Sequence, residues 1–118
     1  KMHEEFGTTM ITDFPELTSP FWNMSRNADG KTAKKIDVIL GGMETIGSAE
    51  RSCDVDMMRD TFHSITDGAY SKLLYSLFSK ERVEAELEKF LEFDFFPRVG
   101  GGIGMTRMIA ALEKHWKD

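Results

Sequence analysis

The chain has 118 residues, a formal net charge of −5, 30% charged residues and one cysteine. A chain of this length forms one domain or part of one, the acidic balance argues against binding nucleic acid through a basic face, and a single cysteine excludes an intrachain disulfide. No apolar run has the length of a membrane span and residues 1–6 lack the apolar segment of a signal peptide, so we expect a protein of the reducing cytoplasm that contacts no membrane.

Short β-branched and apolar runs predict three strands in the first half of the chain. These runs are residues 8–13, 36–40 and 43–51. Gly41 and Gly42 separate the last two runs, which predicts a sharp turn between paired strands. Residues 16–31 contain several turn-forming residues and are predicted to be a loop.

Apolar residues recur every three to four positions in the second half, which predicts helices. The predicted helices run from Asp54 to about Thr66, over residues 69–78, onward from the N-cap residue Ser79, and from about residue 104 to 117. The aromatic residues 93–96 are predicted to form a fourth strand that ends at Pro97. Strands followed by helices predict an α+β fold, an antiparallel β-sheet flanked by helices.

A glycine-rich segment precedes the last predicted helix. Four glycines fall within residues 100–104, and Arg107 lies one turn inside the helix. Glycine lets a flat ligand approach the backbone, while a helix N-terminus and a guanidinium attract phosphate. The segment predicts a nucleotide site, although it matches neither the Walker loop nor the G-x-G-x-x-G turn.

The strand over residues 43–51 carries a second candidate site. Its alternation places Glu44, Ser48 and Glu50 on one face, where their oxygens suit Mg²⁺. Arg51 falls on the other face unless a bulge at Gly47 shifts the register.

Cysteine and histidine give no further site. Cys53 has no histidine beside it and is expected to be a small buried residue. His3, His63 and His115 lack metal-ligand spacing and are expected at the surface or at helix ends.

Four segments, taken in order, resemble the class II aminoacyl-tRNA synthetases, in particular the aspartyl, asparaginyl and lysyl subgroup. The segments are Thr12-Asp13-Phe14-Pro15, Ser19-Pro20-Phe21-Trp22, Asp37-Val38-Ile39-Leu40 with Glu44-Thr45-Ile46-Gly47-Ser48-Ala49-Glu50-Arg51, and Gly100-Gly101-Gly102-Ile103-Gly104-Met105-Thr106-Arg107. The last of them also resembles the ammonia-dependent asparagine synthetase, which forms an aminoacyl-adenylate without tRNA.

The resemblance implies an ATP site. Arg107 matches the family arginine that binds the γ-phosphate, and Gly102 and Gly104 match the glycines beside the adenosine. Glu44 matches the glutamate that helps to hold Mg²⁺ and the phosphates of ATP. ATP and Mg²⁺ are therefore the expected cofactors.

The resemblance also implies an amino-acid site. Gly47 and Ser48 match the small residues beside the amino-acid pocket, and Arg51 matches the arginine that closes this segment. Arg51, Glu44 and Arg107 are the candidate catalytic residues. The implied reaction is attack of a carboxylate on the α-phosphate of ATP with release of pyrophosphate, which depends on positioning and charge neutralisation.

The family's first and second motifs and its anticodon-binding domain have no counterpart in this sequence. Residues 1–118 are therefore expected to be the C-terminal half of a class II catalytic domain, inactive alone, with tRNA reached only through missing domains. An uncovered sheet edge predicts a homo-oligomer. The alternative function is a non-catalytic synthetase-like module that binds a nucleotide or a protein.

Overall fold

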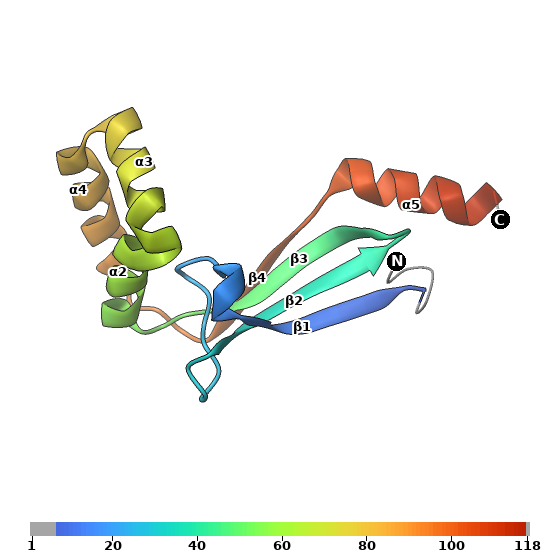
Figure 1. Cartoon of the computed structure of the whole chain (residues 1–118), viewed down its shortest axis with the longest axis horizontal. Helices are drawn as coiled ribbons and strands as arrows, with labels where there is room; N and C mark the ends of the chain where they lie inside the picture. Colours follow the sequence, from blue (N-terminus) through green and yellow to red (C-terminus); the bar gives the residue numbers. More distant parts are fainter. Residues whose placement is uncertain (1–6, 118) are drawn as a thin grey trace.

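The computed structural model describes residues 7–117 and consists of one sheet with helices at both of its ends (Figure 1). The sheet is antiparallel and its four strands lie in the order β1-β2-β3-β4. The strands are β1 (Thr9–Pro15), β2 (Thr32–Leu40), β3 (Met43–Arg51) and β4 (Arg98–Ile103). The α+β fold with an antiparallel sheet is thus confirmed.

Helices occupy the two ends of the sheet rather than a continuous layer over one face (Figure 1). The described helical segments are η1 (Glu16–Thr18), α2 (Val55–Ser64), η2 (Ile65–Gly68), α3 (Ala69–Phe78), α4 (Lys80–Leu91) and α5 (Met105–Lys117). The molecule measures 53 × 33 × 27 Å, and most residues of the four strands are half-buried or exposed. None of the described helices is long and apolar enough to cross a membrane.

The turn between β2 and β3 is the one that its two glycines predict. Gly41 and Gly42 have φ of 60° and 82°, and Leu40 pairs directly with Met43 across the turn. Two consecutive positive φ values define the tight hairpin turn that suits the twist of paired strands. Helix α5 packs on this turn, where Ala111 lies next to Gly41.

The fourth strand is not where the aromatic residues predicted it. Residues 93–96 have no regular structure, and the glycine run itself forms β4. Phe95 packs on Phe90 instead, with ring centroids 5.2 Å apart. The strand needs glycine because β3 and β4 approach closely: a Cβ at Gly101 would lie 2.7 Å from the carbonyl oxygen of Gly47.

Helices α2, α3 and α4 form a small module around Trp22. The predicted caps are confirmed, because Asp54 accepts from the amide of Met57 and Ser79 accepts from that of Arg82. The core residues of the module come from all its elements except α3: Trp22, Met58, Phe62, Val83, Leu87 and Leu91.

Polar contacts also hold the module together. The His63 ring contacts Glu84 at 2.7 Å, and Tyr75 donates a hydrogen bond to the same carboxylate. Burial alone would lower the pKa of His63, but the hydrogen bond to Glu84 raises it above its usual value. His63 therefore has a structural role in linking α2 to α4.

Of the other two histidines, His115 is exposed in α5, as expected, and His3 lies outside the described residues.

The two neighbouring glycines of β4 offer a matched test of this packing. Gly101→Ala should destabilise the chain by roughly 1–3 kcal/mol, because the new methyl group meets the backbone of β3. Gly102→Ala should change the unfolding free energy by well under that amount, since nothing lies within 4 Å of its Cβ position. Urea denaturation of both variants measures the difference. Equal stability of the two variants would contradict the observed register.

Candidate functional site

A β-bulge in β3 organises the candidate site. Val38 pairs with Ile46 but Ile39 pairs with Glu44, so Thr45 is an extra residue in β3. Thr45 is buried, and its carbonyl accepts a hydrogen bond from the amide of Gly104 at 2.8 Å. The bulge therefore joins the middle of the sheet to the start of α5.

The bulge changes the face on which Glu44 lies. Residues that pair across antiparallel strands share a face, so Asp37, Gly47 and Gly102 lie on one face, here named the site face. A Cβ at Gly47 would lie 2.7 Å from Glu44 Oε1, which places the Glu44 carboxylate over Gly47 on this site face. The expected alignment of Glu44 with Ser48 is wrong, because simple alternation ignores the extra residue.

Arg107 lies beside Glu44 at the first turn of α5. Its Nη1 donates to the Glu44 carboxylate at 2.8 Å and to the Glu44 carbonyl oxygen at 2.9 Å. The two side chains are 48% and 41% exposed, so this ion pair contributes little to stability and is easily exchanged for other partners. A hollow of about 260 Å³ opens here, lined by Glu44, Thr45, Gly104, Met105, Thr106 and Arg107.

Asp37 completes the acidic part of the site face, and sequence analysis gave it no role. Its Oδ2 pairs with Lys35 at 3.0 Å, whereas its Oδ1 is buried without a hydrogen-bond partner. The Cβ position of Gly47 is 3.6 Å from this Oδ1 and 2.7 Å from Glu44 Oε1. One feature of the sequence could have pointed to Asp37: it is the only carboxylate in the apolar run of residues 36–40. In the structure it pairs with Gly47 of β3.

The arrangement fits a divalent cation and phosphates. No group of three or more histidine, cysteine, aspartate or glutamate side chains suited to a metal ion occurs within residues 7–117. Mg²⁺ commonly takes only one or two carboxylates, because water and substrate phosphates supply its other ligands. The unpartnered oxygen of Asp37 and the glycine cradle below Glu44 fit such a cation, and Arg107 fits a phosphate.

Arg51 lies on the site face, opposite Ser48, as strand alternation predicts. It shares this face with Glu44 because the bulge at Thr45, rather than one at Gly47, moves Glu44 onto it. Its guanidinium extends over Gly100 and donates to the Gly100 carbonyl oxygen at 3.3 Å. It also donates to Asn23 Oδ1 at 3.2 Å, which ties it to the 20–24 loop. A side chain at position 100 would collide with Arg51, since its Cβ would lie 2.9 Å from Arg51 Nε.

Ser48 is not brought together with the other predicted residues. It pairs with Gly101 and Ile36 on the opposite face of the sheet, and its hydroxyl donates to the carbonyl oxygen of Ile36 at 3.1 Å. The structure thus brings Glu44, Gly47, Gly102, Gly104 and Arg107 together, places Arg51 farther along the same face, and leaves Ser48 out. The expectation for Cys53 is also wrong, because this residue is exposed.

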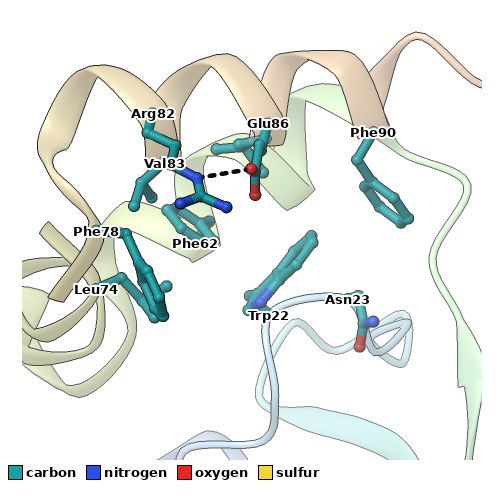
Figure 2. A pocket seen from close by; sticks show the side chains of 10 residues that line it. Trp22, Asn23, Phe62, Leu74, Phe78, Arg82, Val83, Glu86 and Phe90 are labelled. Carbon is teal, nitrogen blue, oxygen red and sulfur yellow. Dashed lines mark hydrogen bonds and ion pairs between the residues drawn. The ribbon is translucent and has the colours of Figure 1, made fainter.

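A separate cavity of about 390 Å³ lies between the 20–24 loop and helices α2, α3 and α4 (Figure 2). Trp22 stacks edge-on with Phe62 and Phe90 beside it, and Arg82 pairs with Glu86 at its rim. Its lining is chiefly apolar, and we interpret it as an incompletely filled part of the core of the helical module. Asn23, at its edge, connects the module to Arg51.

Comparisons with known proteins identify the family of the chain. A family model described as "tRNA synthetases class II (D, K and N)" matches residues 1–116. The asparagine–tRNA ligase of Treponema denticola is 34% identical over 65 residues, which are 48% of this chain and 14% of that protein. The chain therefore belongs to the class II tRNA synthetase family, and its similarity is to the asparaginyl and aspartyl members.

Solved structures show the same fold. The asparaginyl-tRNA synthetase of Pyrococcus horikoshii matches with a TM-score of 0.69 and 20% identity, over 96% of this chain and 25% of that one. The asparaginyl-tRNA synthetase of Entamoeba histolytica, in complex with asparaginyl-adenylate, matches with a TM-score of 0.68 and 15% identity over 94% and 23%. The chain thus spans a quarter or less of the length of these relatives and has the fold of the matching part.

Proposed function

We propose that this chain supplies part of an ATP-dependent site that activates an amino acid as its aminoacyl-adenylate, as in the asparaginyl and aspartyl synthetases. The observation that carries the proposal is the grouping of Asp37, Glu44 and Arg107 around the glycine surface of β3 and β4. Carboxylates for a cation and a guanidinium for a phosphate are what polyphosphate binding requires.

Five residues have a proposed task in binding ATP and Mg²⁺. Asp37 and Glu44 hold Mg²⁺, which would neutralise charge on the phosphates of bound ATP. Arg107 binds the γ-phosphate, and Gly102 and Gly104 leave space for the nucleotide against the backbone.

The Glu44–Arg107 ion pair has a specific part in this proposal. Without ligand the two charges neutralise each other at 2.8 Å. With ATP and Mg²⁺, Glu44 would exchange its arginine partner for the cation, and Arg107 would exchange its carboxylate for phosphate. Both side chains are about half exposed, so the exchange requires little free energy.

Amino-acid binding is proposed at the other end of the site face, where Arg51 extends over Gly100 next to Gly47. Ser48 is left out of this contact set because its hydroxyl lies on the opposite face. The reaction needs the substrate carboxylate in line with the α-phosphate, and these residues contribute by positioning and by charge. Transfer to tRNA is proposed only for an enzyme that includes the remaining parts of its relatives.

Replacement of Arg107 tests the nucleotide site. Arg107→Ala removes a charge-assisted and potentially bidentate phosphate contact, so ATP with Mg²⁺ should bind more than roughly tenfold more weakly. Adenosine should bind as it does to the wild type, because it has no phosphate. Isothermal titration calorimetry measures both, with Arg82→Ala on α4 as the matched control. Wild-type affinity of Arg107→Ala for ATP would remove the nucleotide assignment.

The second candidate is a non-catalytic synthetase-like module, because Arg107 and the open backbone at Gly102 suit nucleotide binding whether or not an adenylate is formed. Such a module would bind a nucleotide or a protein without forming an adenylate. ATP–pyrophosphate exchange with a panel of amino acids distinguishes the two functions: exchange that depends on one amino acid supports the enzyme, and ATP binding without exchange supports the module.

We also propose that the chain self-associates. The face of the sheet opposite the site exposes apolar side chains, of which Val99 is 75% accessible, and α5 exposes Trp116 at 77%. Strands β1 and β4 are both edges of the described sheet. Exposed apolar area beside open edges favours pairing with a second copy. Sedimentation at high concentration should show a dimer or larger species, and a single monomeric species would contradict this.

A further inference from the structure

Three polar side chains, one from each long helix of the helical module, meet at a single oxygen atom. His63 belongs to α2, Tyr75 to α3 and Glu84 to α4. Nε2 of His63 lies 2.7 Å from Glu84 Oε1, and the Tyr75 hydroxyl donates a hydrogen bond to the same oxygen. One carboxylate oxygen thus connects the three helices, and these three residues are here named the helix clasp.

Both nitrogens of the His63 ring face groups that accept hydrogen bonds. Nδ1 lies 2.8 Å from the carbonyl oxygen of Arg59, one turn earlier in α2, and a carbonyl oxygen only accepts. Glu84 Oε1 also acts as an acceptor, because Tyr75 donates to it. A neutral imidazole has one N–H and satisfies one of the two contacts, whereas the imidazolium donates in both. The geometry therefore fits the protonated form of His63.

The groups around the ring favour the same form. Burial lowers the pKa of His63, but the hydrogen bonds to Glu84 and to the Arg59 carbonyl, with the charges of Glu84 and Asp60, raise it above its usual value. Glu88, one turn beyond Glu84 in α4, forms an ion pair with Arg59 and also interacts with the positive charge of the ring. The charges that act on His63 from α2 and α4 are therefore chiefly negative.

The carboxylate of the clasp is ionised throughout the range in which His63 titrates. Burial raises the pKa of Glu84, but the hydrogen bonds from Tyr75 and His63, with the charges of His63 and Lys80, lower it below its usual value. The contribution of Glu84 to stability is lost only as the pH falls through this lowered pKa. At neutral pH and above, the state of the clasp is therefore set by His63 alone.

The clasp is next to the part of the core that holds the 20–24 loop. The ring of Phe62 packs edge-on against the His63 ring at 5.2 Å and against Trp22 at 5.4 Å. Asn23, the next residue of the loop, accepts a hydrogen bond from Arg51 of the site face. A chain of direct contacts thus leads from the clasp to the loop that supports Arg51.

We propose that the helix clasp is a pH-sensitive link, which stabilises the helical module around Trp22 while His63 is protonated and weakens when the ring loses its proton. Deprotonation leaves one ring nitrogen with a lone pair that faces an oxygen acceptor, so one of the two contacts is lost. This inference does not depend on the proposed function, because it concerns the folding of the module and involves no ligand.

The sign of the pH dependence follows from the raised pKa of His63. A group whose pKa is raised by folding contributes its full stability below its unfolded pKa, which is about 6.5 for histidine. This contribution is lost as the pH rises through the higher pKa of the folded state. The module should therefore be more stable in weakly acidic than in weakly alkaline solution.

Urea denaturation of the whole chain between about pH 5.5 and about pH 8.5 tests the clasp. The unfolding equilibrium constant of wild type should rise roughly threefold to tenfold over this range, a modest change because the His63 and Glu84 side chains are about one-third exposed. His63→Gln can still donate to Glu84 but carries no titrating proton, so its constant should change less than about twofold. His115→Gln, at an exposed position of α5, is the matched control and should behave as wild type.

The variants separate the clasp from other sources of pH dependence. An equal rise of the unfolding constant in His63→Gln and wild type would overturn the inference. Absence of a rise in wild type, or its loss in His115→Gln as well, would do the same.

Nuclear magnetic resonance on folded wild type tests the clasp without relying on the stability of a variant. The ring signals of His63 should titrate with a midpoint above about pH 6.5, and the indole N–H signal of Trp22 should shift with the same midpoint. Glu84→Gln, where it folds, should move the His63 midpoint to lower pH, because the charged acceptor is gone. A His63 midpoint at or below about pH 6.5, or a Trp22 signal that does not follow it, would overturn the inference.

Discussion

The bulge at Thr45 is the constraint on which the candidate site depends. One extra residue in β3 moves the carboxylate of Glu44 from the face of Ser48 to the face of Gly47. The same residue accepts the hydrogen bond that begins α5, which places Arg107 beside Glu44. In a regular strand the carboxylate of Glu44 would lie on the face of Ser48, away from the glycine surface.

Charged side chains lie at both ends of that glycine surface, and at one end the carboxylates of Asp37 and Glu44 are paired with Lys35 and Arg107. Asp37 and Glu44 lie at one end, and Arg51 and Arg98 lie at the other. The side chains of Glu44 and Arg51 cover Gly47 and Gly100, whereas nothing lies within 4 Å of the Cβ position of Gly102, so the backbone is open to a ligand there. The end with Glu44 and Arg107 suits metal-bound phosphates.

The sequence predicted those parts of the fold that depend on local patterns. The hairpin at Gly41, the cap residues and the apolar stripes of α2 and α4 follow from turn chemistry and helical periodicity. It failed where tertiary contacts decide. The glycine run forms β4 because only glycine allows the close approach to β3, and the aromatic residues before it pack on α4. The face of Glu44 depended on a bulge that strand alternation cannot locate, whereas Arg51 lies opposite Ser48 as alternation predicts.

The exchange of partners at the Glu44–Arg107 ion pair is the central claim, and titration of ATP into Glu44→Gln with and without Mg²⁺ tests it most directly. Loss of the carboxylate frees Arg107 for phosphate, so the variant should bind metal-free ATP more tightly than wild type, by up to about fivefold, and should gain little from Mg²⁺. Glu86→Gln on α4 serves as the control. If Glu44→Gln binds metal-free ATP as wild type does and retains the full gain from Mg²⁺, the claim is contradicted.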